Sequence, residues 1–145
     1  MNTASATQPT LISNKKSSTE ATSSSPLGMH YLAECHQCDP ELIYDADFVE
    51  SLLISTAKHC GATIVDTKFH HFEPYGVSGV VIIEESHFHV HTWPEHRYAA
   101  IDLFTCDLSL NFKKAVDFLQ EKIGCAPIKY QTLKRGLISG RTNSL

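Results

Sequence analysis

The run from Gly76 to Glu95 constrains the fold of this chain more than any other segment. The residues from Val80 to Ile83 are apolar and β-branched, which predicts a strand buried on both faces or nearly so. Polar residues begin abruptly after Ile83. From His87 to His91, polar and apolar residues alternate, which predicts a second strand with three imidazoles on one face. Because the two strands meet around Glu85-Ser86, we expect the chemistry of the protein at that bond.

The segments around this run predict an α+β domain. Apolar residues at helical spacing predict one helix that begins after Asp45 or Asp47 and ends at Gly61, and a second helix over residues 110–123. Strands are predicted over residues 29–35, 62–72, 98–105 and 126–134, with a polar turn through Asp39-Pro40. Two helices and several hairpin-linked strands predict a two-layer α/β sandwich, a mainly antiparallel sheet covered by two helices on one face.

Length and composition favour one domain without a polyanionic or membrane partner. The chain has 145 residues, of which 42% are hydrophobic, enough for one core. Its net charge of −4 and the lack of a basic stripe predict no nucleic-acid binding. No apolar run approaches the ~18 residues of a membrane span, and no secretory signal precedes the domain, so a cytoplasmic protein is expected. Residues 1–27 are rich in Ser and Thr and predict a disordered extension. Residues 137–145 predict a C-terminal tail.

The cysteines and histidines leave metal and redox hypotheses open. Five cysteines, an odd number, without an export signal indicate reduced thiols. Cys35-His-Gln-Cys38 is a C-x-x-C motif, which can be half of a zinc site or a redox pair. A structural zinc site normally needs a second ligand pair at similar spacing, and the sequence offers none. The row His87, His89 and His91 is the alternative metal site, because three imidazoles on one face suit zinc or copper.

The pattern from Pro74 to Cys106 resembles the prokaryotic-type S-adenosylmethionine decarboxylase proenzymes, which are pyruvoyl enzymes. The resemblance extends from about Gly28 to about Gly136 and implies a decarboxylase domain over residues 28–136. The chain departs from the family pattern at His89, where a small or hydroxylated residue is expected, and at Met29, where a basic residue is common. Two such αβ units are implied to associate, with substrate sites near the shared interface.

The implied activity needs an electron sink for the carbanion left by decarboxylation, and no ordinary side chain supplies one. The lysines of this chain lie near no glycine-rich phosphate cradle, so pyridoxal phosphate is not favoured. The resemblance implies that Ser86 attacks the carbonyl of Glu85, that the chain is cleaved between them, and that Ser86 becomes a pyruvoyl group. That group would form a Schiff base with S-adenosylmethionine. The product, decarboxylated S-adenosylmethionine, is the aminopropyl donor for spermidine synthesis.

The resemblance also assigns roles to other residues. His91 is the implied processing base, and Cys106 is the implied proton donor, since a thiol with an ordinary pKa near 8.5 is mostly protonated at neutral pH. Ser78 and His91 are the expected donors to the oxyanion formed during processing. Five residues at ~3.3 Å each separate His91 from Ser86, so the chain must bend or a facing strand must return the serine end.

The sequence also contains candidate residues for binding the substrate. Phe72 matches the position in the family that stacks on adenine. Glu95 can accept hydrogen bonds from ribose hydroxyls. Tyr75 and Trp93 are candidate neighbours of the sulfonium cation, because aromatic faces attract cations.

Overall fold

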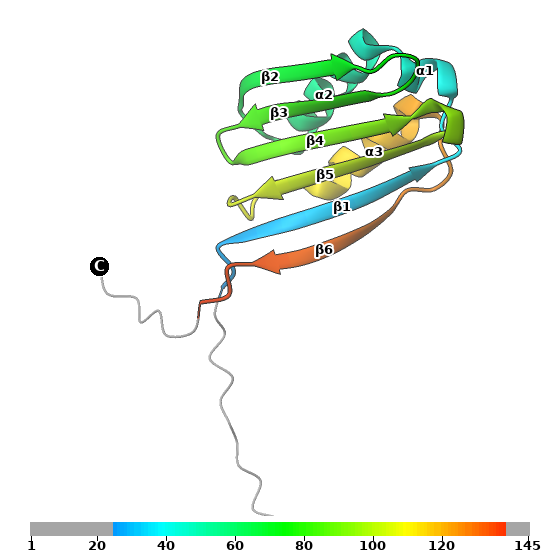
Figure 1. Ribbon diagram of the computed structural model, residues 1–145. Helices are drawn as coiled ribbons and strands as arrows, with labels where there is room; N and C mark the ends of the chain where they lie inside the picture. The colour runs from blue at the N-terminus through cyan, green and yellow to red at the C-terminus, as the bar shows by residue number, and fades with distance from the viewer. Residues whose placement is uncertain (1–24, 139–145) are drawn as a thin grey trace, which may run out of the picture.

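Residues 25–138, described by a computed structural model, form a six-stranded antiparallel sheet with its helices on one face (Figure 1). Residues 1–24 and 139–145, which include most of the predicted extension and tail, lie outside the described part. The strand order is β2-β3-β4-β5-β1-β6. The elements are β1 (Gly28–His36), α1 (Pro40–Tyr44), α2 (Ala46–Cys60), β2 (Ile64–His71), β3 (Val77–Ile83), β4 (Ser86–Trp93), the 3-10 turn η1 (Pro94–His96), β5 (Tyr98–Thr105), α3 (Phe112–Ile123) and β6 (Lys129–Arg135). The predicted two-layer α+β architecture is confirmed.

The helix ends follow the local signals in the sequence. The Asp45 carboxylate accepts hydrogen bonds from the backbone N–H groups of Asp47 and Phe48, so Asp45 is the N-cap of α2. Gly61 ends that helix in the left-handed conformation, with φ of 96°. Asn111 caps α3 by accepting from the backbone N–H of Lys114. Helix α1 was not predicted, although Asp39 caps it and Pro40 begins it.

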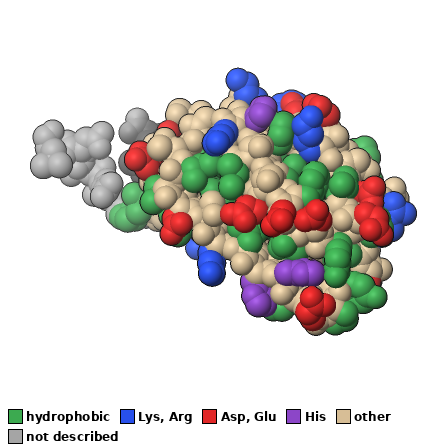
Figure 2. All heavy atoms as spheres, turned by 90° about the horizontal axis from the view of Figure 1, so that it is seen from above, with side chains coloured by type: hydrophobic (Ala, Val, Ile, Leu, Met, Phe, Trp, Pro, Cys, Tyr) green, Lys and Arg blue, Asp and Glu red, His purple; other side chains and the backbone are tan. Residues whose placement is uncertain are grey.

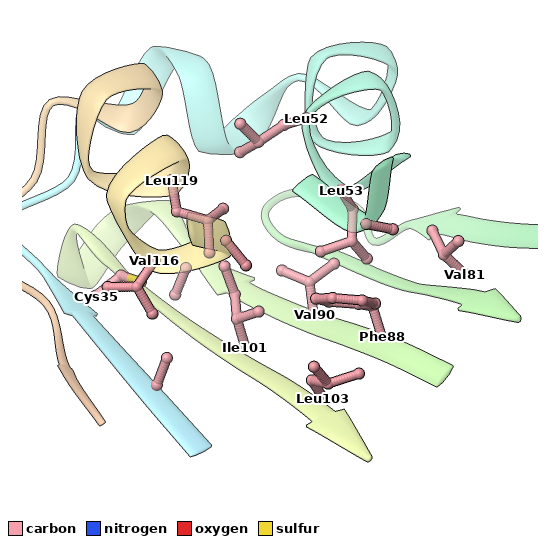
Figure 3. Packing of buried hydrophobic residues seen from close by; sticks show 14 of the residues in the cluster. Cys35, Leu52, Leu53, Val81, Phe88, Val90, Ile101, Leu103, Val116 and Leu119 are labelled. Atoms are coloured by element: carbon pink, nitrogen blue, oxygen red, sulfur yellow. The ribbon is translucent and has the colours of Figure 1, made fainter. Parts of the chain in front are cut away.

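The core lies between the helices and the sheet. Figure 3 shows Leu52 and Leu53 of α2 and Leu119 of α3 above Val90 and Ile101 of the central strands. The further labelled members of this cluster are Cys35, Val81, Phe88, Leu103 and Val116. Each large apolar side chain buried in this way stabilises the fold by about 1.5–3 kcal/mol relative to an exposed one.

The other face of the sheet has no helix over it in the described chain (Figure 1). The prediction that Val80–Ile83 is buried on both faces is therefore wrong. Along β3, buried residues alternate with half-buried or exposed ones, and Ile82 is 43% exposed. The residues that point to this uncovered face on the central strands are mostly half-buried; they include Ser78, Val80, His87, His89, His91, Ala100, Asp102 and Phe104.

Candidate active site

Ser86 stands at the tight turn between β3 and β4. The turn leaves only Glu84 and Glu85 between the paired residues Ile83 and Ser86. The backbone φ of Ser86 is 141°, a region that side chains other than glycine rarely adopt. A backbone held in such a region stores about 1–3 kcal/mol of strain. The serine that the sequence singles out thus has a strained backbone conformation.

The Glu85 carbonyl, which Ser86 would attack, is held by the end of β5. Its oxygen accepts a hydrogen bond from the backbone N–H of Cys106 at 2.9 Å. The Cys106 thiol lies 3.4 Å from the same oxygen and also donates to it. The Glu85 carboxylate accepts from the backbone N–H of Thr63 at 3.2 Å, which fixes the other side of the residue. Cys106 therefore contacts the Glu85 carbonyl of the Glu85-Ser86 bond directly.

Ser78 and His91 form a second polar pair, at the other end of the same hairpin. They face each other across β3 and β4, and Ser78 Oγ lies 2.6 Å from His91 Nδ1. Burial lowers the pKa of His91, and the positive charge of a protonated His89 lowers it further, against the opposing effect of Asp102. His91 is therefore neutral, and able to accept a proton, at lower pH than a free histidine.

Within one chain, His91 does not reach Ser86. Both lie on β4, five residues apart, which corresponds to about 16 Å along a strand. The facing strand does not close this distance, because the register pairs Ser78 with His91 and Ile83 with Ser86. Neither of the two routes expected from the sequence brings the pair together in a single protomer. The expected oxyanion donors Ser78 and His91 are absent from the Glu85 carbonyl, where Cys106 donates instead.

The residues expected to bind substrate lie at the same end as His91. Phe72 directly follows β2, is 48% exposed and lies edge-on to the His70 ring. Glu95, in η1, lines a cavity of about 370 Å³ between α1, the β2–β3 turn and η1. The other residues around this cavity are Pro40, Glu41, Tyr44, Tyr75 and Pro94. The site thus divides between the two ends of the hairpin.

Helix α1 forms one wall of this cavity because Thr92 anchors it. The buried Thr92 hydroxyl donates to the carbonyl of Ile43 in α1 and accepts from the backbone N–H of Val77 in β3, both at 2.8 Å. Glu41 and Tyr44 of α1 were not predicted as site residues. The capping Asp39 and the Pro40 at the helix start were the signal for α1, but its position beside Glu95 depends on the Thr92 contacts.

The histidine row does not form a metal site. His91 is directed to Ser78, whereas His87 Nε2 and His89 Nδ1 lie 3.6 and 3.5 Å from the Asp102 carboxylate. His30 Nε2 lies 3.3 Å from the same carboxylate. Among residues 25–138, no group of three or more histidine, cysteine, aspartate or glutamate side chains is arranged to hold a metal ion. The metal-binding alternative is not supported.

The surface seen from above the β2 edge of the sheet bears mixed charge. Figure 2 shows acidic side chains in a row across this side, with basic side chains scattered around it. No helix in the described part of the chain is long and apolar enough to cross a membrane.

Comparison with known proteins decides the family. The family model for S-adenosylmethionine decarboxylase matches residues 29–136, which includes both ends of the hairpin and Cys106. The chain belongs to the S-adenosylmethionine decarboxylase family. Among its relatives is the S-adenosylmethionine decarboxylase proenzyme of Thermodesulfovibrio yellowstonii, 42% identical over 119 residues, which cover 82% of this chain and 88% of the relative. The proenzyme of Clostridium kluyveri is 43% identical over 111 residues, covering 77% and 88% of the two chains.

A solved structure of this family has the same fold. The crystal structure of the adenosylmethionine decarboxylase from Aquifex aeolicus superimposes with a TM-score of 0.73 and 31% sequence identity. The match covers 83% of this chain and 99% of the other. The two-layer fold described above is therefore shared with a solved member of the decarboxylase family.

Proposed function

We propose that this protein cleaves itself between Glu85 and Ser86, and that Ser86 becomes the pyruvoyl group of a decarboxylase that acts on S-adenosylmethionine. Membership of the decarboxylase family supports the reaction class. One observation supports the self-cleavage. Ser86 has a strained backbone conformation, and the Glu85 carbonyl that it would attack already accepts a hydrogen bond from the backbone N–H of Cys106.

The first step of processing is the attack of Ser86 Oγ on the Glu85 carbonyl carbon. The C–N bond between the two residues breaks as an ester forms, and the Ser86 nitrogen takes up the hydroxyl proton, which removes the strained geometry at Ser86. Removal of the Ser86 α-proton then expels the Glu85 carboxylate, and the dehydroalanine that is left tautomerises and is hydrolysed to the pyruvoyl group with loss of ammonia. Negative charge develops on the Glu85 oxygen during the attack. The Cys106 N–H, 2.9 Å away, is already in place to stabilise it, as donors of an oxyanion hole do.

The base for this step comes from a second copy of the chain. His91 and Ser78 lie about 16 Å along the hairpin from Ser86 of their own chain, too far for proton transfer. The sheet face that presents His91 is half-buried yet has no layer over it in the described residues. Two protomers that pack these faces together in antiparallel orientation place the His91 end of one hairpin beside the Ser86 end of the other. This arrangement gives a composite site with self-association of two αβ units.

The residues of this chain suit the pyruvoyl group. When present, its carbonyl supplies the electron sink for the bond that releases carbon dioxide. Cys106 Sγ lies 3.4 Å from the Glu85 oxygen, so the thiol stands beside the position of the group and can deliver a proton to the substrate carbon that loses carbon dioxide.

The end of the hairpin that contains His91 has residues suited to bind the adenine, the ribose and the sulfonium of the substrate. Phe72 offers an exposed ring for adenine, and Glu95 offers a carboxylate for ribose hydroxyls. Tyr44 and Tyr75 line the same cavity as Glu95 and present faces that attract a cation such as a sulfonium. In a composite site, these residues bind the substrate that reacts at Ser86 of the partner protomer.

The mass of the chain under denaturing conditions tests this proposal. Active protein should consist of two chains, residues 1–85 and 86–145, the second beginning with pyruvate instead of serine. Ser86→Ala should abolish both cleavage and decarboxylation, because the same atoms are the nucleophile and the source of the keto group. Ser51→Ala, an exposed serine on α2, is the matched control and should cleave normally. A single chain of 16.1 kDa in active protein would refute the proposal.

A further inference from the structure

Three cysteines that the proposed reaction does not use lie together at one end of the core. Cys35 and Cys38 follow each other at the end of β1, and Cys125 lies in the loop between α3 and β6. The Cys38 thiol donates to the carbonyl of Cys35 at 3.3 Å. The N–H of Ala126, next to Cys125, donates to the carbonyl of His36 at 2.8 Å, and burial together with the nearby Cys125 raises the pKa of both Cys35 and Cys38. Figure 3 shows Cys35 among the buried side chains beside Val116 of α3. All three thiols are free.

The backbone keeps this cluster in place. Gln37 adopts a left-handed φ of 59°, which turns the chain sharply between the two cysteines. Cys38 is tied to Arg97 by its N–H and its carbonyl, at 2.9 and 3.0 Å. On the other side, Gln120 donates to the carbonyls of Cys125 and Ala126 at 2.6 and 3.2 Å.

The chain before β6 runs beside the end of β1, which brings Cys125 near Cys38. Strands β1 and β6 pair antiparallel through Glu34 and Lys129. The hydrogen bond from the N–H of Ala126 to the carbonyl of His36, at 2.8 Å, shows that the two segments still run side by side there.

The proposed cleavage would place the three cysteines of this cluster on two different chains. Cys35 and Cys38 belong to residues 1–85, whereas Cys125 belongs to residues 86–145. We infer that Cys125 is a redox modification site which, with Cys38 as its partner, forms a disulfide that links the two chains of the processed enzyme covalently. This inference rests on the proposed self-cleavage for its interchain character, but the disulfide itself can form in the uncleaved chain.

A peroxide supplies the oxidising equivalents. Cys125, the most accessible of the three thiols, attacks a peroxide oxygen as the thiolate, which breaks the O–O bond and gives a sulfenic acid and water. The Cys38 thiolate then attacks the Cys125 sulfur, the S–O bond breaks, and a second water leaves. Two thiols lose two electrons and two protons in total, and the peroxide is reduced to water.

The pKa values and positions of the three thiols determine how fast the disulfide forms and which thiol is the partner of Cys125. Burial raises the pKa of Cys125, and it raises the pKa of Cys38 to about 11. Burial, together with the neighbouring thiols, raises the pKa of Cys35 further than that of Cys38. The thiolate is the reacting form, so oxidation should be slower than at an exposed thiol and should accelerate as pH rises. Cys35 is fixed within β1 opposite Ala99, whereas Cys38 lies past the end of that strand, which favours Cys38 as the partner that can move toward Cys125.

Denaturing electrophoresis without reductant tests the inference. After treatment with hydrogen peroxide, processed enzyme should run as one species near 16.1 kDa and separate into two chains when reduced. Cys125→Ser should abolish the linked species. Cys60→Ser, which removes another buried core thiol, is the matched control and should retain it. Peptide mapping should locate the bond between Cys38 and Cys125.

Two further measurements separate failure of this inference from failure of the proposed function. Ser86→Ala protein keeps one chain, and its peptide map should show the same disulfide after oxidation. The exposed thiol of Cys106 reports whether the oxidant was effective. Separate chains that persist at raised pH long after Cys106 has been fully oxidised, a bond between Cys35 and Cys38, or a linked species that survives Cys125→Ser would each overturn the inference.

Discussion

Two variants that are inactive alone should restore activity when they assemble together, if the active site is shared between protomers. Ser86→Ala removes the nucleophile, and His91→Ala removes the base at the opposite end of the hairpin. The two positions are five residues apart on β4, about 16 Å, so no single chain contains a complete site. In a mixed dimer, one site combines the intact Ser86 of one chain with the intact His91 of the other. The second site contains both substitutions and stays inactive.

The symmetry of a dimer sets the size of the effect. Equal amounts of the two chains, assembled at random, give about half mixed dimers, and each mixed dimer has one complete site of two. Co-expression should therefore restore about one quarter of the wild-type activity. About half of the His91→Ala chains should be cleaved, whereas each variant expressed alone should remain uncut. Decarboxylation assays and intact mass measurement give the two numbers independently.

A pair of substitutions at the same end is the matched control. Ser86→Ala and Cys106→Ala both alter the hairpin end, where Cys106 contacts Glu85. Mixed dimers of these two variants contain no complete site, so their activity should not rise. Mixed dimers of Ser86→Ala and His91→Ala that form, as native mass measurement would show, but neither cleave nor decarboxylate would refute the shared site. Cleavage of His91→Ala on its own would remove His91 as the base.

Three other expectations follow from the geometry. Cys106→Ala should still cleave, because its backbone N–H remains at the Glu85 carbonyl. Its turnover in a steady-state assay should fall by about 10²–10⁴-fold, as for loss of a positioned acid. Wild-type turnover would contradict this role. The rate of self-cleavage should rise with pH as His91 loses its proton, with its midpoint below the ordinary value of 6.5, so a midpoint at or above pH 6.5 would count against His91 as the neutral base. Gly79→Ala should destabilise the fold by about 1–3 kcal/mol in chemical denaturation, because an added Cβ would lie 2.0 Å from the Phe69 ring, and Phe69→Leu in the same chain should recover part of the loss.

The secondary structure was predictable because its signals are local. Asp45 and Gly61 mark the ends of α2 through contacts within a few residues, and alternation marks β4 as a strand. Helix α1 was missed because five residues are too few for a periodic pattern. The burial of β3 was predicted wrongly because a continuous apolar run does not show whether a second layer covers its outer face.

The sequence by itself determined the two layers, the hairpin with Glu85 and Ser86 at its turn, and the family. These depend on residue type and on spacing along the chain, which a sequence contains in full. Only the tertiary structure decided that Cys106 holds the Glu85 carbonyl, while His91 lies at the far end of β4. It also decided that the segment around Cys125 runs beside the end of β1, which contains Cys35. Contacts of this kind depend on which strands pair and in which register, and that is settled by burial of the whole core rather than by any one segment.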